Sequence, residues 1–482
     1  MTHWAHHRRL AAFGGIALVA ALPALVPAAC SGPTLTATPI HTEAGLADLD
    51  ASTTAIAVDG GALRPFHVGG PSDPGPGAIY VTISGESNAL TGYPFPPNDY
   101  SLDTYMYDGW QFEIEAYIVV VDKITLWSDP NQSSTNQGLH GPAVAELTGP
   151  FVVDLHKGGA LVGQGGYPEQ ATALGVIANQ NLNGNASFDP TLTYGFGFST
   201  IPAGPVAGYT GEVAGYDAYN VNLTPDEADD YAYMVAHGAS VYYRGHAVWQ
   251  GQSSQYGCTE TNAGNGASAR LVVTDGGLDG GSPTYEDGGY DFTKLPQHGM
   301  SFRFAFSTPT NYVNCQNYTA VGAPLPGEAS PRGIQVSSAG SAVAQVTIHM
   351  DHPFWESFAE DTPVHWDDIA AQYVGVAGAA DGGVVESHID DFRGVGFQPF
   401  TDHAGTPLPW RNCSGPFYTP PGNGAMFFST LSIPVCPGGS DPAVCIRDYY
   451  DYIRYTQSTQ GHLNSQGLCF IDRQFPAPAG GS

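Results

Sequence analysis

The stretch from Gly109 to Trp127, GWQFEIEAYIVVVDKITLW, constrains the fold more than any other part of the chain. Phe112, Ile114 and Ala116 alternate with polar residues, which is the period of a strand with one exposed face. The run from Tyr117 to Val121 is apolar throughout, which indicates burial on both faces. The stretch therefore predicts one long strand that passes from the half-exposed to the buried part of a sheet, with a bulge where the pattern changes.

The composition extends this prediction to the rest of the chain. Glycine (62), proline (38) and tyrosine (26) are abundant, while only 12% of the residues are charged. Such a composition favours short strands joined by turns over long helices. Because 482 residues exceed what one sandwich core holds, we expect an all-β protein with two antiparallel β-sandwich domains, Ig-like or transthyretin-like, and few short helices.

The domain boundaries follow from local composition. A Gly/Pro-rich stretch without periodicity, residues 30–77, predicts a flexible tether. The first sandwich is expected over residues 78–223 and the second, with the disulfides, over residues 239–482. A helix over residues 224–238, with a capping box at its start and Gly238 at its end, is expected to join them.

The N-terminus predicts export. Residues 1–29 place two arginines before an apolar run and small residues, as a secretory signal peptide does. The segment that follows, Pro27 to Cys30, resembles the lipobox of bacterial lipoproteins, in which the cysteine is acylated. The family usually has leucine where Pro27 stands, so ordinary cleavage after Ala28 stays open. The resemblance implies a Gram-negative lipoprotein anchored through Cys30 in the outer membrane, on its periplasmic or extracellular face, and Ser31 fits that sorting.

Cysteine usage agrees with an oxidising compartment. If Cys30 is acylated, six cysteines remain to form disulfides, and six cysteines allow fifteen pairings. Proximity in the sequence favours Cys258 with Cys315, Cys436 with Cys445, and Cys413 with Cys469.

The charge balance limits the partners. The formal net charge is −30, and such a surface repels the phosphates of nucleic acid. Carboxylates in excess favour calcium instead. An acidic glycine-rich loop offers such ligands, although without EF-hand spacing, and a solvated loop is the alternative. Its acidic residues are Asp275, Asp279, Glu286, Asp287 and Asp291.

Signatures of catalysis are weak. The sequence GESNA around Ser87 approaches a nucleophile elbow, which needs a helix directly after the turn. The segment that follows, LTGYPFPPNDY, does not predict one, so we expect Ser87 to be a turn residue. Acidic pairs such as Asp367/Asp368 and Asp390/Asp391 are compatible with glycoside hydrolysis, but also with a solvated acidic surface.

The segment VTIHMDHPFWESF, residues 346–358, predicts a metal site at a strand end. On a strand His349 and Asp351 share a face, and His352 lies on the opposite face unless Pro353 turns the chain. Further ligands are expected from the nearest histidines in the sequence, His365 and His388. Imidazole together with carboxylate is a ligand set that suits zinc or copper. The alternative is that the histidines are structural, hydrogen-bonded at the strand end.

The pattern FEIEAYIVVVDKITL…VAELTGPFVVDLHKGG is similar to that of periplasmic β-sandwich families, among them the MbnP-like copper-binding lipoproteins. This resemblance implies a sandwich fold and is compatible with copper.

Together these features predict a lipid-anchored, non-catalytic binding module. Aromatic residues in loops, Tyr93, Phe95 and Trp110, are candidate contacts to a protein or glycan ligand. A periplasmic copper- or zinc-binding protein is the alternative, and an extracellular hydrolase is the third candidate.

Overall fold

The computed structural model describes 57–58, 61–62, 64–65, 75–97, 105–206, 218–251, 259–261, 292–296, 298–355, 363–376, 385–396, 402–406, 408, 410–413 and 446–476. The signal peptide, Cys30, most of the tether and the acidic loop over 275–291 lie outside these residues, as do Cys258, Cys436 and Cys445. None of the helices in the described ranges is long and apolar enough to span a membrane.

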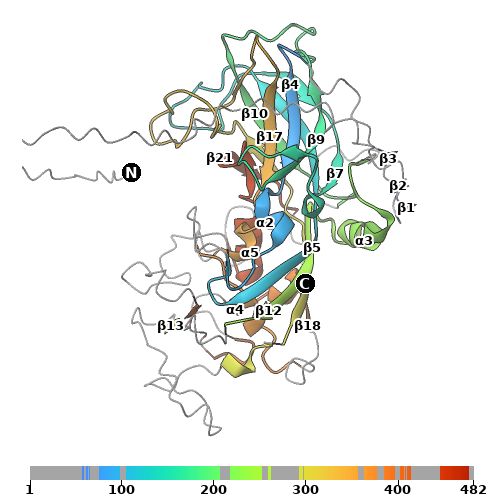
Figure 1. Ribbon diagram of the computed structural model, residues 1–482, viewed down its shortest axis with the longest axis vertical. Coiled ribbons are helices and arrows are strands. Elements are labelled where there is room, and N and C mark those ends of the chain that lie inside the picture. The colour runs from blue at the N-terminus through green and yellow to red at the C-terminus, as the bar shows by residue number, and fades with distance from the viewer. Residues whose placement is uncertain are drawn as a thin grey trace, which may run out of the picture. The chain divides into compact units, whose positions relative to one another are not determined.

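The described residues are mostly strands with a few short helices (Figure 1). The larger sheet has twelve strands, with the main path β18-β14-β12-β5-β10-β15-β22. These strands are β18 (Val385–His388), β14 (Met300–Phe306), β12 (Val241–Trp249), β5 (Trp110–Trp127), β10 (Thr193–Thr200), β15 (Thr310–Val313) and β22 (Phe470–Arg473). The remaining strands are β3 (Arg64–Pro65), β6 (Ala143–Leu147), β7 (Phe151–Asp154), β11 (Tyr219–Asn220) and β16 (Ile334–Gln335).

The smaller sheet has six strands in the order β21-β20-β17-β4-β9-β8. They are β21 (Gly467–Leu468), β20 (Gly461–Leu463), β17 (Ala342–Ile348), β4 (Ile79–Ser84), β9 (Gln170–Ile177) and β8 (Leu161–Val162). Figure 1 shows β4 beside β17, and these two strands run parallel although they are far apart in the sequence. Two short pairs complete the strands, β1 (Ala57–Val58) with β2 (Gly61–Ala62) and β13 (Thr259–Thr261) with β19 (Trp410–Asn412).

Helices are short in the described ranges. The α-helices are α2 (Glu86–Thr91), α3 (Ala228–His237), α4 (Asp367–Ala371) and α5 (Tyr449–Gln457). The 3-10 turns are η1 (Leu155–Lys157), η2 (Pro225–Glu227), η4 (Phe292–Lys294), η5 (His352–Phe354) and η6 (Ile389–Phe392).

The long strand predicted from the sequence is β5, and its burial follows the expected course. Glu113 and Glu115 are exposed in its first half, and the register shifts beside Glu115 where it pairs with β12. Beyond this bulge both faces are buried. Tyr117, with Val119 and Val121, joins the core shared with the smaller sheet. Ile118, with Ala116 and Val120, packs under α3 through residues such as Met234. The run is therefore apolar because both faces of the strand are packed, one against the core shared with the smaller sheet and the other against α3.

Two parts of the fold prediction need correction. The sheets are mixed, since β4–β17, β14–β18 and β7–β11 are parallel pairs, so the expectation of purely antiparallel sheets is wrong. The residues on either side of the predicted linker also share sheets: β5 pairs with β12, and β4 pairs with β17. The helix predicted over 224–238 exists, with the capping box between Thr224 and Glu227 and with Gly238 left-handed at its end. It covers a sheet rather than separating two domains.

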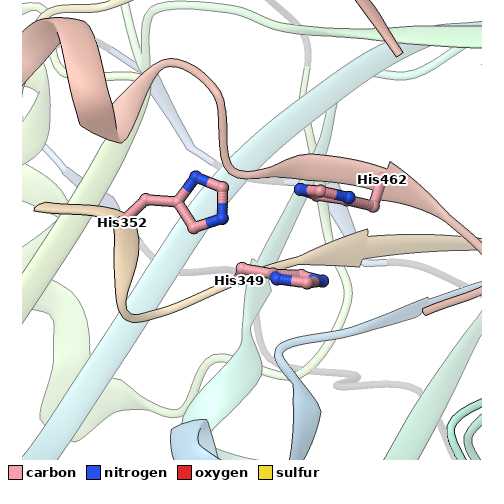
Figure 2. Close-up of side chains that lie close together, drawn as sticks. All are labelled: His349, His352 and His462. Atoms are coloured by element: carbon pink, nitrogen blue, oxygen red, sulfur yellow. The ribbon is translucent and has the colours of Figure 1, made fainter. Parts of the chain in front are cut away.

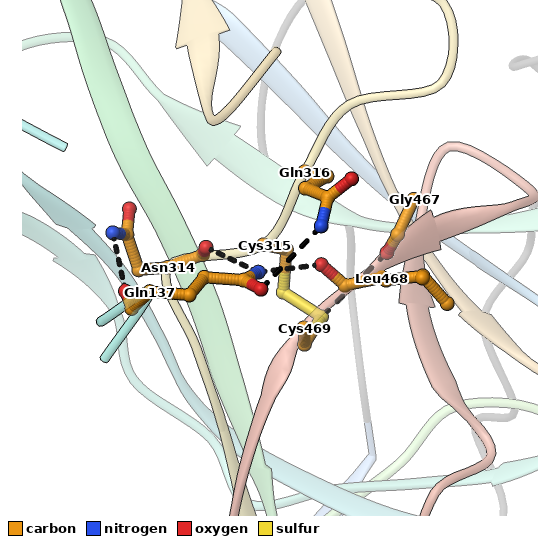
Figure 3. The surroundings of a disulfide bond; sticks show 7 residues. All are labelled: Gln137, Asn314, Cys315, Gln316, Gly467, Leu468 and Cys469. Carbon is orange, nitrogen blue, oxygen red and sulfur yellow. Dashed lines mark hydrogen bonds between the residues drawn. A yellow bond between two sulfur atoms is a disulfide. The ribbon is translucent and has the colours of Figure 1, made fainter. Parts of the chain in front are cut away.

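One disulfide lies within the described residues, between Cys315 and Cys469 (Figure 3). It joins the end of β15 to the start of β22, and the Gln137 side chain donates to the carbonyls of Asn314 and Leu468 beside it. The sequence-proximity pairings of Cys315 with Cys258 and of Cys469 with Cys413 are therefore wrong. Cys413 is also disulfide-bonded, and its partner lies outside the described residues.

Candidate functional site

The candidate site lies where the parallel strands β17 and β4 end and the antiparallel strand β20 begins. Along β17 the apolar side chains of Val346 and Ile348 enter the core, while Gln345 and Thr347 lie on the opposite face. His349 follows directly and continues the polar alternation. On the neighbouring strand His462 pairs in register with Thr347. Strand register thus brings two histidines together from distant parts of the sequence.

A third histidine joins them because the chain turns immediately after β17. Residues His352 to Phe354 form η5, with Pro353 in its first turn. This turn places the His352 ring edge-on to both neighbours, with centroids 5.3 Å from His349 and 5.4 Å from His462. His349 and His462 stack, with centroids 3.9 Å apart. Figure 2 shows the three rings around one common space.

The geometry of this cluster suits a metal ion. One nitrogen from each ring can be chosen so that all three lie within 4.8 Å of one another. The three side chains are buried, with relative exposures of 5% for His349, 0% for His352 and 1% for His462. Among the histidine, cysteine and acidic side chains of the described residues, these three histidines are the group that lies close enough together to hold a metal ion.

Hydrogen bonds at the outer nitrogens fix which nitrogen of each ring is left for a ligand. The Nε2 of His349 lies 3.0 Å from the Ser465 carbonyl, which can only accept, so this nitrogen carries the proton. The Nδ1 of His352 lies 2.7 Å from the Thr459 hydroxyl. Because that hydroxyl donates to the Thr456 carbonyl, it accepts from His352. His349 Nε2 and His352 Nδ1 therefore carry the protons, and the lone pairs of these two rings are at His349 Nδ1 and His352 Nε2.

His462 has the least satisfied ring of the three. Neither of its nitrogens makes a hydrogen bond of good geometry within the described residues, and the same holds for His352 Nε2. The backbone near Thr459 and Gln466 still acts on His462 electrostatically and partly offsets the fall in its pKa. A buried imidazole left this way costs free energy unless something binds it.

The electrostatics keep His352 and His462 neutral. Burial lowers the pKa of His352 well below its ordinary value, and the neighbouring His349 and His462 lower it further. Burial, followed by the proximity of His349, lowers the pKa of His462 in the same way. Neutral imidazole is the form that binds zinc or copper, so these two rings are in the ligand form at neutral pH.

A carboxylate borders the cluster on its more exposed side. Glu86 Oε1 lies 3.2 Å from His349 Nε2, and 19% of the Glu86 side chain is exposed. On another side, Asp351 Oδ1 lies 3.9 Å from His352 Nε2, while Asp351 Oδ2 accepts from the Trp355 indole at 2.6 Å. The Trp355 ring also lies against His352, with centroids 3.7 Å apart.

The ligand set predicted from the sequence is only partly the one that the structure assembles. His349 is in the cluster and Asp351 is beside it. His365 instead lies near Asp108, with 3.9 Å between His365 Nδ1 and Asp108 Oδ2. His388 contacts Glu386 and the Tyr233 hydroxyl. The expectation that His352 faces away from His349 is wrong, because η5 returns it to the site.

His462 and Glu86 were missed as site residues. Neither lies in a recognisable ligand pattern, and His462 stands alone in the sequence GHLNS. The signal that unites them is the pairing of β4, β17 and β20, which local sequence does not contain.

The structure also bears on the other candidate residues. A helix, α2, does follow β4 directly, so the expected lack of a helix after GESNA is wrong. The residue with the strained left-handed backbone is, however, Glu86 (φ 61°) and not Ser87. Tyr93, Phe95 and Trp110, proposed above as ligand contacts, are all buried, at 0%, 5% and 0% exposure.

The acidic pairs have separate structural partners. Asp367 forms a buried ion pair with Arg411, and the Tyr449 hydroxyl donates to Asp368. Asp390 pairs with Arg393, and Asp391 accepts from the Tyr373 hydroxyl.

Asp368 predicts a pH dependence of stability. Burial raises its pKa to about 7, so the folded state holds the proton between about pH 4 and 7 while the unfolded chain does not. This stabilisation is lost as pH rises through 7. The buried histidines with lowered pKa values, His352, His365 and His462, gain stability over the same range, because their unfolded forms lose the proton there. Only the difference between the wild type and a variant at position 368 therefore reports Asp368. We expect the contribution of Asp368 to the free energy of unfolding to fall by about 1 kcal/mol when the pH rises from 6.5 to 8.

Urea unfolding of the wild type and Asp368→Asn at these two pH values measures this effect. The variant should lose less stability over the interval, whereas Asp390→Asn, at an exposed ion pair, should behave as the wild type. An equal loss in Asp368→Asn and the wild type would contradict the assignment.

Comparisons with known proteins found no matching family model, no matching curated protein and no matching solved structure.

Proposed function

We propose that this protein binds one transition-metal ion, zinc or copper, through His349, His352 and His462. The observation that carries the proposal is the cluster of three buried imidazoles that each offer one ring nitrogen, with these nitrogens within 4.8 Å of one another. Three histidines are a ligand set that both metals accept, and a carboxylate nearby can complete the charge balance.

The spacing is that of a site close to its bound geometry. Around a tetrahedral zinc ion, nitrogens at about 2.0–2.1 Å from the metal lie roughly 3.4 Å apart. The upper limit of 4.8 Å in the cluster therefore requires a contraction of roughly 1.4 Å at most. Rotations of the rings about χ1 and χ2 must supply this movement, and they must also take His349 and His462 out of their stack, because the lone pairs lie in the ring planes.

A purely structural role for the histidines explains the cluster less well. A histidine that serves only the structure of a core usually has hydrogen bonds at its ring nitrogens. His349 and His352 each make one such hydrogen bond, at Nε2 and Nδ1. His462 reaches only the backbone near Thr459 and Gln466, without a hydrogen bond of good geometry, and its stacking on His349 provides none. A metal ion would bind one nitrogen of His462 together with one nitrogen of each of the other two rings.

Metal titration of the purified protein tests the proposal. We expect one equivalent of Zn²⁺ or Cu²⁺ per chain, measured by elemental analysis after gel filtration. Because Trp355 lies against His352, Cu²⁺ should quench tryptophan fluorescence in step with occupancy, while Zn²⁺ should not. The proposal would be contradicted if the protein bound less than about 0.2 equivalents of either metal at a micromolar concentration of free metal.

Metal binding is the alternative that the sequence analysis set beside a binding module for a protein or glycan ligand. The burial of Tyr93, Phe95 and Trp110 removes the argument for a glycan or protein ligand at those residues. The separate partners of Asp367 and Asp368 likewise give no support to a hydrolase.

For the location we propose an exported protein anchored through Cys30. The Cys315–Cys469 disulfide supports an oxidising compartment. Incorporation of labelled fatty acid into the wild type, and its loss in Cys30→Ala, tests the anchor.

A further inference from the structure

We propose that Glu86 is the positioning residue of the metal site: its carboxylate holds His349 in the tautomer that binds metal through Nδ1. This inference rests on the proposed metal site. It assigns a role to a residue outside the three ligands, and it makes a prediction about the metal-free protein as well.

The first observation is the contact itself. Glu86 Oε1 lies 3.2 Å from His349 Nε2, and the Gln466 side chain donates to the same oxygen at 3.4 Å. His349 Nε2 also reaches the Ser465 carbonyl at 3.0 Å. Both neighbours of Nε2 are acceptors, so the proton stays there and the lone pair of Nδ1 remains for the metal. A carboxylate that accepts from the outer nitrogen of a ligating histidine orients the ring and raises its basicity.

The second observation is how the fold delivers the carboxylate. Register pairs Thr347 with Ser84 across β17 and β4, so the next positions on the same face are His349 and Glu86. The chain turns sharply at Gly85 and enters α2 at Glu86. A Cβ at Gly85 would lie 2.7 Å from the Ala89 Cβ and 2.9 Å from the Leu155 Cβ, so the turn has no space for a larger residue. The Glu86 amide donates to the Ser84 hydroxyl and closes the turn.

The third observation is backbone strain. Glu86 has φ 61° and Ser465 has φ 73°, the left-handed region that glycine tolerates far better than other residues. These two residues supply the two acceptors at His349 Nε2. Strained non-glycine residues persist where the surrounding structure requires them, and they cluster at functional sites. At position 86 glycine would remove the strain but also the carboxylate.

Two substitutions separate this role from a structural one. Glu86→Gln keeps the size and the strained backbone but replaces the charge, and Glu86→Gly removes both the carboxylate and the strain. We expect each variant to bind Zn²⁺ about 10–100-fold more weakly than the wild type, in a competition titration with a chromophoric chelator. Glu113→Gln, at an exposed glutamate of β5, should bind as the wild type does.

The thermal midpoint of the metal-free protein is the second readout. Because glycine relieves the left-handed backbone, we expect Glu86→Gly to keep or raise the midpoint, by up to roughly 2 °C for a chain of this size. If Glu86 served only the fold, its replacement by glycine would lower the midpoint.

The outcomes distinguish the two proposals. If the wild type binds no zinc or copper, the proposed function fails. If the wild type binds and both Glu86 variants bind equally tightly, the positioning role is wrong while the metal site stands. A fall in the midpoint of metal-free Glu86→Gly also overturns the positioning role, because the strained glutamate would then stabilise the fold itself.

Discussion

Replacement of His462 by phenylalanine is expected to lower zinc affinity by roughly 1000-fold or more, which corresponds to about 4 kcal/mol of binding free energy. His462 stacks on His349 and is one of the three proposed ligands. Two histidines leave an ion with half of a tetrahedral ligand set at most. Phenylalanine keeps a ring at the stacked position and leaves no cavity, although its ring is somewhat larger, so the loss reports the nitrogen atoms. Competition titration measures the change.

The same substitution is expected to stabilise the protein without metal. Removal of two buried nitrogens without hydrogen bonds of good geometry should raise the free energy of unfolding by about 1 kcal/mol in urea, because the larger phenylalanine ring offsets part of the gain. His388→Ala is the matched control, because the sequence predicted His388 as a ligand and the structure places it against Tyr233. It should leave zinc affinity unchanged. If His388→Ala weakens binding and His462→Phe does not, the ligand set proposed here is wrong.

Arg411→Ala is expected to give the largest loss of stability, about 3–5 kcal/mol in the free energy of unfolding. Arg411 pairs with Asp367, and both side chains are 2% exposed. Its guanidinium lies over the Trp249 ring at 4.4 Å. Without it the Asp367 carboxylate stays buried, close to Asp108, whose own pKa is raised by burial and then by Asp367. The charge then has no cation to compensate it.

A double-mutant cycle separates this electrostatic effect from lost packing. In the Arg411→Ala background, Asp367→Asn should recover part of the loss, since it removes the uncompensated charge. Arg393→Ala removes a half-exposed partner of Asp390 and should cost about 1 kcal/mol or less. Equal costs at Arg411 and Arg393 would contradict the argument from burial.

Local sequence was sufficient to predict the elements with strong periodicity or capping. The course of β5 and the helix that ends at Gly238 were predicted because alternation and a capping box are local signals. The division into two domains is not confirmed, because it depended on which strands pair, and strands from both sides of the predicted linker share sheets. The parallel pairing of β4 with β17 has no local signal, and a helix that covers a sheet looks the same in sequence as a helix that links two domains.

The candidate site, like the fold, could be predicted only where the signal is local. His349 could be proposed because it ends an alternating strand beside an acid. His352 was assigned to the wrong face, since strand geometry was extended past Ile348 into a 3-10 turn. His462 and Glu86 enter the site only through strand register, and the strain at Glu86 is a property of the backbone that its side chain does not reveal.

The order of strands in the smaller sheet has a consequence for when metal can be acquired. The site needs β4, near the start of the described chain, and β20, near its end, on either side of β17. A nascent chain therefore contains His349 and His352 well before His462, and the proposed site cannot form until β20 has been made and has paired with β17. If the chain crosses a membrane unfolded, the ion must come from the compartment where folding finishes, and the metal available there decides which ion the protein carries.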